Sequence, residues 1–434
     1  MHGFPTLVDL AHELNCGAVR AREVVEASLE TIAARQPVHN AFVEVHTTTS
    51  RSVARDLDAA DPRGALHGLP LAVKDNIDEA GTVCAAGCQA YDDRIPTSDA
   101  PVVAALRAAG AVVVGRCNMN ELADGVTGEN VHHGNVHNPA RRGFRAGGSS
   151  SGSAAAVADG SVAAALGTDT GGSVRIPAAL CGVVGFKPSA GLLPTEGTLP
   201  LSTSLDHVGL LTRTTLDAVA LLDALVPLGL YAPQLGDRDP GATPRIGVLE
   251  GFGDQADGGT GRCLEESLRI LERNGAQLRP VSIPELSEGL GLLARIYGPE
   301  AAEIHRPRLA SRPDGFGAEV RRDLARGSRE GAAERRLAAL ARRDQIRTLL
   351  GRVAADVDLL VSPTTPLPAT PHGAPDPHRY LAFTCPFNLT GQPALSVPMG
   401  EVGGLPVGLQ IVGRPGEDLA VLRAGVVFQR ALSG

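Results

Sequence analysis

Apolar positions recur with two different periods along the chain, and the alternation between these periods predicts the fold class. From residue 68 to residue 210, short apolar runs bounded by Gly alternate with helical patterns. The expected strands are 69–73, 111–115 and 162–166, and the expected helices are 101–109 and 150–158. Such alternation is typical of an α/β protein, so we expect a mixed, mainly parallel central sheet covered by helices on both faces.

Further patterns lie on either side of this region. The chain opens with two predicted helices, one capped by Thr6 and ending near Gly17, and one at 21–34. The later expected elements are a surface connection at 232–245, a strand at 245–249, a helix near 262–274, helices between Leu290 and Leu350, and strands at 358–363 and 394–398. In the arginine-rich helical stretch, Leu337, Leu340 and Ala341 are expected to share one apolar face.

The composition and net charge of the chain exclude several classes of function. With 434 residues and 43% hydrophobic residues the chain can bury a large core, and its net charge of −8 argues against a nucleic-acid surface. The first residues lack the basic and apolar segments of a signal peptide, and no run of about 18 apolar residues predicts a membrane span. Seven cysteines, an odd number, fit a reducing cytoplasm better than a disulfide framework.

No metal site is expected from the sequence. Cys84 and Cys88 have no second pair of ligands, and the histidines of loop 132–137 fit a solvated or structural cluster better than a metal site. Asp206 and His207 suggest a Ser–His–Asp alternative, but adjacent side chains rarely form such a triad.

Two Gly- and Ser-rich segments, 147–158 and 166–178, carry the clearest chemical signal. The alternative interpretation is a flexible linker, but both segments run into apolar helical or strand patterns, which a linker lacks. Glycine tolerates dihedrals that turn N–H groups toward a reacting atom, so the stretch 170–173 predicts an oxyanion nest with a hydroxyl nucleophile at Ser173. A helix from about Val174 would add its dipole at the same place.

The lysine usage supplies a candidate base for this serine. Of the 40 Lys and Arg residues only Lys74 and Lys187 are lysine. A buried lysine can lose its proton and an arginine cannot, so a general base is one role in which Arg cannot replace Lys. Lys74 ends an apolar run and is the predicted base, whereas Lys187 is expected to form a structural ion pair.

These motifs resemble the amidase signature family over nearly the whole chain. Besides the two serine segments, the matching stretches are 73–76, 118–121, 182–188, 204–209, 362–366 and 404–410. The resemblance implies a Ser–Ser–Lys triad: Ser173 is the nucleophile, Ser149 is the bridging serine with a cis peptide bond, and Lys74 is the base. It also implies that the oxyanion hole is formed by N–H groups of Thr170, Gly171, Gly172 and Ser173.

The resemblance also implies one amidase domain, 1–434. Its expected parts are N-terminal helices at 5–60, a signature core at 65–210, a helical substrate-entrance region at about 285–350 and a C-terminal sheet part at 355–434. The residues expected to contact substrate on the same basis are Met119, Tyr297, Glu303 and His305.

One position distinguishes between members of this family. The glutamine-handling subunit of glutamyl-tRNA amidotransferase usually has an Asp three residues before a Thr, where the carboxylate holds the glutamine ammonium group. Here that residue is Leu381, and an apolar side chain cannot bind an ammonium group. With Phe383 and Phe387 nearby, the sequence instead suggests an apolar or aryl acyl group.

The resulting hypothesis is a cytoplasmic hydrolase that cleaves the C–N bond of small linear amides through an acyl-enzyme. Carbamates (urethanes) and esters are further expected substrates, because the chemistry needs only a carbonyl with a leaving group. No cofactor, metal, nucleic acid or membrane is expected as a partner, and a homodimer is left open. The alternative hypothesis is a glutaminase subunit of a tRNA-dependent amidotransferase.

Overall fold

A mixed sheet of eleven strands forms the centre of the molecule. The computed structural model describes residues 4–61, 64–226, 244–353 and 355–433. The strands are β1 (Phe42–Val45), β2 (Pro70–Lys74), β3 (Val112–Cys117), β6 (Ala164–Thr168), β7 (Val184–Lys187), β8 (Val208–Thr212), β9 (Arg245–Leu249), β10 (Gln277–Val281), β11 (Leu359–Pro363), β12 (Ala394–Val402) and β13 (Leu405–Val412). Their order is β1-β3-β2-β6-β8-β7-β12-β13-β11-β9-β10. A short ribbon of β4 (His137–Asn138) and β5 (Arg141–Arg145) lies apart from it.

Parallel pairings occur in two parts of this sheet. β2 is parallel to β3 and β6, and β9 is parallel to β10 and β11, whereas the middle of the sheet, from β6 to β11, is joined by antiparallel pairs. All residues of β2, β3 and β6 are buried, which explains why they form short, nearly continuous apolar runs in the sequence.

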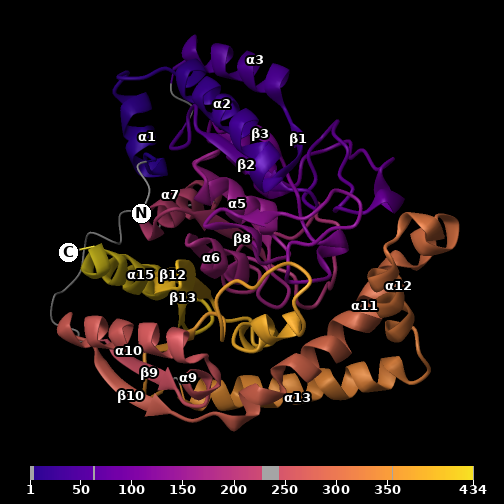
Figure 1. The fold of residues 1–434 in the computed structure, drawn as a ribbon, viewed down its shortest axis with the longest axis vertical. Helices are drawn as coiled ribbons and strands as arrows, with labels where there is room; N and C mark the ends of the chain where they lie inside the picture. The colour runs from indigo at the N-terminus through magenta and orange to yellow at the C-terminus, as the bar shows by residue number, and fades with distance from the viewer. Residues whose placement is uncertain (1–3, 62–63, 227–243, 354, 434) are drawn as a thin grey trace.

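Helices cover the sheet. They are α1 (Leu7–Asn15), α2 (Ala21–His39), α3 (Thr47–Asp58), α4 (Pro101–Ala108), α5 (Ser151–Ala158), α6 (Arg175–Cys181), α7 (Thr215–Leu225), α9 (Phe252–Gln255), α10 (Gly258–Arg273), α11 (Gly289–Ser311), α12 (Ala318–Gly327), α13 (Ala332–Val353), α14 (Cys385–Leu389) and α15 (Asp418–Ser433). Short 3-10 turns are η1 (Gln89–Tyr91), η2 (Glu121–Ala123), η3 (Pro284–Glu288), η4 (Pro313–Gly315) and η5 (Pro377–Leu381). Figure 1 shows α11, α12 and α13 together on one side of the molecule, far from α1–α3.

The predicted fold class, a mixed sheet covered by helices, is confirmed, and its strand pairings in the described part of the chain comprise four parallel and six antiparallel pairs. Thr6 caps α1 through a capping box with Asp9, as the N-terminal pattern predicts. The second helix is longer than expected, because α2 continues through Pro37 and ends at Asn40 in the left-handed conformation. Most of the expected surface connection at 232–245 lies outside the described residues.

The expected apolar face of α13 is wrong. Leu337 is 63% exposed and Ala341 is also exposed, whereas the buried positions are Ala339, Ile346 and Leu350. The long helix packs against its neighbours through a narrow row of buried residues. The leucines near its N-terminal end do not indicate the position of that row.

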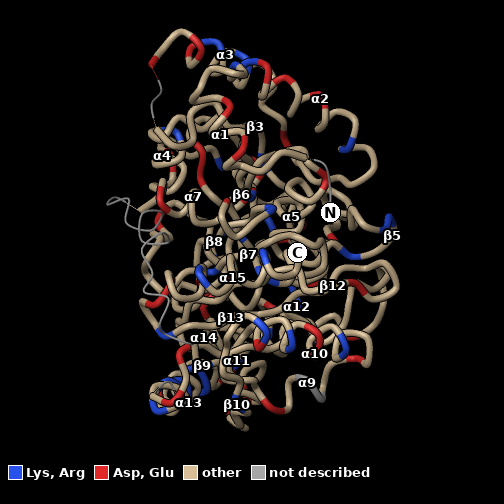
Figure 2. Tube along the Cα trace, turned by 90° about the vertical axis from the view of Figure 1, so that its left-hand side faces the viewer, with Lys and Arg blue, Asp and Glu red and all other residues tan. Residues whose placement is uncertain are grey.

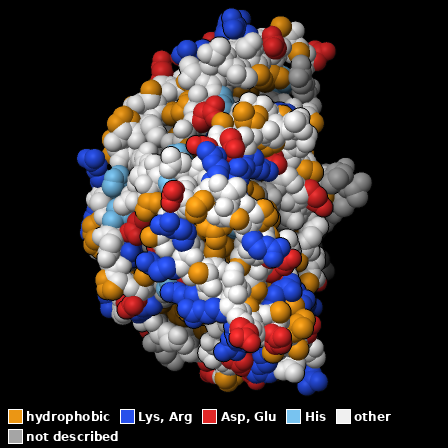
Figure 3. Space-filling view, turned by 90° about the vertical axis from the view of Figure 1, so that its right-hand side faces the viewer, with side chains coloured by type: hydrophobic (Ala, Val, Ile, Leu, Met, Phe, Trp, Pro, Cys, Tyr) orange, Lys and Arg blue, Asp and Glu red, His pale blue; other side chains and the backbone are white. Residues whose placement is uncertain are grey.

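Charges of both signs alternate over the surface. Figure 2 shows the Arg residues of α13 interspersed with acidic residues. Two of its arginines pair with other helical elements, Arg336 with Glu300 and Arg342 with Glu288. On the face shown in Figure 3, basic side chains are likewise spread among acidic and apolar ones rather than gathered in one stripe. Among the described residues, none of the helices is long and apolar enough to cross a bilayer.

The close packing of α5 leads to a stability prediction. A Cβ atom on Gly152 would overlap the Ala41 carbonyl and lie 2.6 and 2.7 Å from the Asn118 backbone O and N atoms. Gly152→Ala is therefore expected to lower the free energy of unfolding by about 3 kcal/mol, because backbone atoms must move. The control is Gly261→Ala in α10, where no atom lies within 4 Å and a gain of about 0.5–1 kcal/mol is expected. Urea denaturation measures both, and equal stability of the two variants would contradict this account.

Candidate active site

The end of β2 places Lys74 in the interior. Its side chain is fully buried, and its Nζ atom donates hydrogen bonds to Ser149 Oγ at 2.7 Å and to Thr168 Oγ1 at 2.8 Å, with the Thr168 carbonyl at 3.3 Å. Burial lowers the pKa of Lys74 to about 7, although the nearby carboxylates of Asp206 and Asp169 oppose the shift. A neutral amine is therefore well populated near neutral pH.

Ser149 stands between this lysine and the second serine segment. Its peptide bond with Gly148 is cis, as the family resemblance implies. A Cβ atom on Gly148 would overlap the Asn120 side chain, so glycine is required there. The Asn120 N–H donates to the Ser149 carbonyl at 3.3 Å, an interaction that sequence reasoning missed although Asn120 lies in a matching stretch.

Ser173 lies beside Ser149 at the end of the nest. The N–H of Ser150 donates to the Ser173 carbonyl at 3.1 Å, which joins the two serine segments directly. Among the described residues the Ser173 hydroxyl makes no hydrogen bond, and the residue is 4% exposed. The structure therefore brings Lys74 into contact with Ser149 and joins Ser173 to the residue after Ser149, with the Ser173 hydroxyl unengaged.

In the nest at 170–173, the Thr170 side chain and the Gly171 carbonyl are held by hydrogen bonds, whereas the N–H groups and the Ser173 hydroxyl are unused. Thr384 Oγ1 donates to the Gly171 carbonyl at 2.7 Å, and Thr170 Oγ1 donates to the Asp206 carboxylate. Gly172 has a φ of 141°, and a Cβ atom there would overlap Thr384. Within the described part of the chain, none of the four backbone N–H groups at 170–173 donates a hydrogen bond. Buried N–H groups normally have partners, so this segment can accept a ligand oxygen.

A buried ion pair holds the nest in place. The Asp169 carboxylate pairs with the Arg175 guanidinium at 3.0 Å, and both side chains are fully buried. Arg175 also donates to the Thr384 carbonyl, Gln410 and Asn388. Burial is the largest single effect and would raise the pKa of Asp169, but the charge and hydrogen bonds of Arg175, together with Lys187 and Asn388, outweigh it and hold the pKa well below its usual range.

Sequence reasoning missed this cluster. Asp169 and Arg175 lie within the second serine segment, and Gln410 ends the 404–410 stretch, so all three stand in matching motifs. The contact of Arg175 with Gln410 joins positions more than 200 residues apart, and no local sequence pattern indicates it.

Comparisons with known proteins identify the family of this chain. The model of the family described as Amidase matches residues 23–422. The chain belongs to the amidase family. A curated relative, the A subunit of glutamyl-tRNA(Gln) amidotransferase from Symbiobacterium thermophilum, is 37% identical over 95% of this chain and 94% of the relative. The corresponding protein of Exiguobacterium sibiricum is 36% identical over 100% of this chain and 98% of the relative.

Solved structures of other amidase family members have the same fold. One described as an amidase has a TM-score of 0.91 and 37% identity, over 98% of this chain and 99% of its own. The A subunit of glutamyl-tRNA(Gln) amidotransferase from Thermotoga maritima has a TM-score of 0.78 and 34% identity, over 93% and 90%. A 6-aminohexanoate cyclic dimer hydrolase has a TM-score of 0.89 and 26% identity, over 99% and 97%. These likenesses and the family match identify this amidase family chain as a hydrolase of C–N bonds.

The second lysine of this amidase is not paired as expected. Lys187 is fully buried and donates to the carbonyls of Pro188 at 3.0 Å and Gln392 at 2.6 Å, so the predicted ion pair is wrong. Two carbonyl dipoles can satisfy an ammonium group without a carboxylate in contact. Burial lowers the pKa of Lys187 to about 7.

Only some of the predicted substrate residues stand beside the nest. Leu381 and Leu293 both approach Gly171, since a Cβ atom there would meet their methyl groups at 3.1 and 2.8 Å. Phe383 and Phe387 are fully buried, and Phe383 stacks on Phe252 with ring centroids 4.6 Å apart, which places both phenylalanines in the core.

The other predicted contacts are divided between the core and two cavities. Met119 and His305 are fully buried, and His305 Nδ1 lies 2.8 Å from the Tyr91 hydroxyl. Glu303 borders a cavity between α11 and the start of α13, whereas Tyr297 lines a different one.

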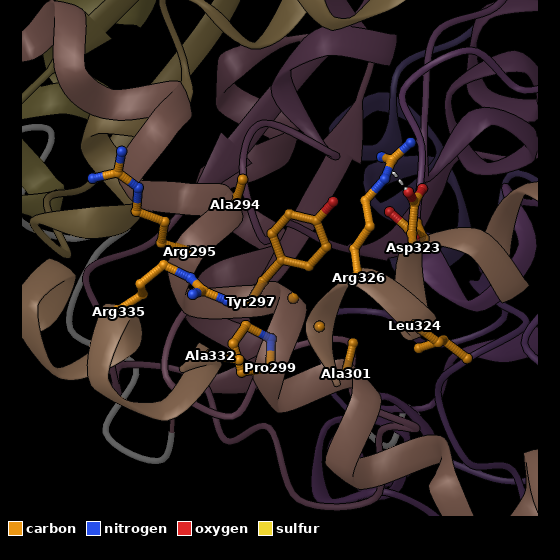
Figure 4. Close-up of a pocket in the computed structure, with 13 residues that line it drawn as sticks. Ala294, Arg295, Tyr297, Pro299, Ala301, Asp323, Leu324, Arg326, Ala332 and Arg335 are labelled. Atoms are coloured by element: carbon orange, nitrogen blue, oxygen red, sulfur yellow. Dashed lines mark hydrogen bonds and ion pairs between the residues drawn. The ribbon is translucent and has the colours of Figure 1, made fainter. Parts of the chain in front are cut away.

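The cavity at Tyr297 has a volume of about 200 Å³ and lies between α11, α12 and α13 (Figure 4). None of its lining residues belongs to the predicted triad. Ala294, the residue directly after Leu293, also lines it, so the cavity borders the part of α11 that meets the nest. Asp124 also lines it, and burial, aided by Asp323, raises the pKa of Asp124 to about 7.

His207 and Asp206 do not form a serine-protease-like triad. The Asp206 carboxylate accepts from Thr170 and from the backbone of Leu201 and Ser202, whereas His207 Nδ1 lies 2.7 Å from the Leu205 carbonyl. Burial lowers the pKa of His207 to about 3, so this ring stays neutral.

The buried ion pair gives a second stability prediction. Asp169→Asn leaves the Arg175 guanidinium buried without a carboxylate, so the free energy of unfolding is expected to fall by about 3–5 kcal/mol. The control Glu265→Gln removes the exposed Arg269–Glu265 pair and is expected to change stability by less than about 0.5 kcal/mol. Denaturant unfolding followed by circular dichroism compares the two. A loss below about 1 kcal/mol in Asp169→Asn would contradict the role given to this pair.

Proposed function

We propose that this chain hydrolyses the C–N bond of an amide with Ser173 as nucleophile, Ser149 as proton relay and Lys74 as general base. The observation that carries the proposal is the set of unused N–H groups at 170–173, which border a serine hydroxyl without a hydrogen bond. A buried amine with a pKa of about 7, bonded to Ser149, provides a base close to the same point.

The proposed reaction has two halves. Neutral Lys74 takes the Ser149 proton while Ser149 takes the Ser173 proton, and Ser173 Oγ attacks the carbonyl carbon. The N–H groups at 170–173 hold the resulting oxyanion. The C–N bond then breaks, the relay returns the proton to the departing amine, and an acyl-enzyme ester remains. Water, deprotonated by the same relay, attacks the ester and releases the acid and free Ser173.

Two substrate classes have support. The curated relatives are subunits of glutamyl-tRNA(Gln) amidotransferase, and their similarity over nearly the full length favours a subunit that releases ammonia from glutamine for a partner complex. Leu381 and Leu293 beside Gly171 favour the second class, small apolar or aryl amides, with carbamates and esters as side substrates. The similarity to amidotransferase subunits favours glutamine as the substrate more strongly. The argument for small apolar or aryl amides rests on the apolar side chains beside the nest.

Other features belong to the same proposal. We propose that the whole chain acts as one amidase domain, with Tyr297 and Leu381 contacting the substrate. The cysteines that the structure describes are free, which supports a reducing cytoplasm as its place of action.

The catalytic prediction uses glutamine, an aliphatic primary amide, an aryl amide and a small aryl carbamate. Ser173→Ala and Lys74→Ala are each expected to lower kcat/KM on the best substrate by at least about a thousandfold, because nucleophile and base act as a unit. Ser52→Ala, on the exposed surface of α3, is the control and should retain wild-type rates. Mass spectrometry of a quenched reaction should find the acyl group on Ser173.

The panel also separates the substrate classes. Glutamine turnover only with a partner complex supports the amidotransferase reading, whereas turnover of aryl amides by the isolated chain supports the free hydrolase. Full activity in Ser173→Ala would overturn the proposed chemistry for either class.

The pKa of Lys74 predicts the pH dependence. The base acts only when neutral, and the lowered pKa of about 7 makes the protonated, inactive form dominant at lower pH. We expect kcat/KM to fall about tenfold for each pH unit below 7 and to level off above it. Lys74→Arg keeps a permanent positive charge and should show no such rise with pH. A wild-type profile that is flat from pH 5 to pH 8 would contradict Lys74 as the base.

A further inference from the structure

Three side chains outside the candidate active site converge on one point beneath α12. Cys88 precedes η1, Glu121 begins η2, and His132 lies in the loop before β4. Their potential ligand atoms, one sulfur, one carboxylate oxygen and one ring nitrogen, all lie within 4.8 Å of one another. Cys88 and Glu121 are buried, and the His132 side chain is 13% exposed.

Hydrogen bonding accounts for only part of this arrangement, because the Cys88 thiol bonds the Glu121 carboxylate. His132 Nε2 lies 3.2 Å from Glu121 Oε1, within the distance of an ion pair, but this buried nitrogen makes no hydrogen bond. The Cys88 sulfur makes a weak contact of 3.5 Å with the Gly315 carbonyl. A buried ring nitrogen that makes no hydrogen bond calls for an explanation, and a shared ligand at the centre of the three atoms provides one.

We propose that Cys88, Glu121 and His132 form a zinc site. Thiolate, imidazole and carboxylate are ligands of Zn²⁺, and three protein ligands with water in the fourth position are a common coordination set. Tetrahedral bonds of about 2.0–2.3 Å place the ligand atoms about 3.3–3.6 Å apart, so side-chain shifts of about 1 Å close the site. Binding releases the Cys88 proton to solvent as the S–Zn bond forms. Sulfur and nitrogen ligands disfavour Mg²⁺ and Ca²⁺.

The surroundings give the ion a structural role. The N–H of Gly317 donates to both Glu121 oxygens, at 2.9 and 3.2 Å, so the carboxylate is already oriented by the segment that leads into α12. The ion would join this helical region to the loops around Cys88 and His132. Asn120, next to Glu121, bonds Ser149, so the site lies one residue from the wall of the candidate active site. This inference does not depend on the proposed reaction.

The first measurement needs no variant. The full chain, without a polyhistidine tag, is stripped with a chelator and titrated with Co²⁺ and then Zn²⁺. We expect one equivalent of Co²⁺ to produce thiolate-to-cobalt charge-transfer absorption, and Zn²⁺ to displace it. Zn²⁺ should also raise Tm, because it binds the folded state.

Two variants and a matched control assign the ligands. Cys88→Ser and His132→Gln are each expected to lose either the charge-transfer band or the binding of one equivalent of zinc. Both variants should also lose the zinc-dependent rise in Tm. Cys84→Ser changes another buried cysteine of the same loop, which contacts the Ile77 and Glu79 carbonyls and not the proposed ion, so it should bind like wild type. A wild-type chain that gives no charge-transfer band would overturn the proposal. Binding that persists equally in Cys88→Ser would mean an adventitious ion only and would overturn it too.

Discussion

The pair of Asp169 and Arg175 is the interaction on which the architecture of the site depends. It lies where β6 ends and α6 begins, and its hydrogen bonds reach Asn388 of α14 and Gln410 of β13. Two charges held away from water persist only when nearly every polar atom has a partner, and here neighbouring polar groups meet that condition. The two halves of the sheet, which are far apart in sequence, are thereby joined directly behind the nest.

The nest and the lysine use the low polarity of the same interior in opposite ways. Burial disfavours the charged form of Lys74, whereas the same surroundings strengthen the attraction of unpaired N–H groups for a negatively charged ligand atom. Both effects need a dry interior between the sheet and its helices. The surrounding fold therefore sets the reactivity of groups that would be ordinary on a surface.

The sequence indicates the parts of this site whose causes are local. Continuous apolar runs predict β2, β3 and β6, and the scarcity of lysine draws attention to Lys74 before any geometry is known. The contacts of Arg175 with Gln410 and of Leu293 with Gly171 join distant segments, and only the fold brings them together. Phe383 is misleading for a related reason, because its nearness in sequence to Leu381 does not show that the ring faces the core.

Thr384 and Leu381 divide two tasks within one short segment. Thr384 fixes the Gly171 carbonyl through its hydroxyl, while Leu381, less than one helical turn earlier, presents a methyl group to the same glycine. The residue that maintains the nest is thus separate from the residue that borders the space in front of it. Under the proposed reaction, replacement of Leu381 changes the surface offered to the substrate and leaves the support of the nest by Thr384 intact.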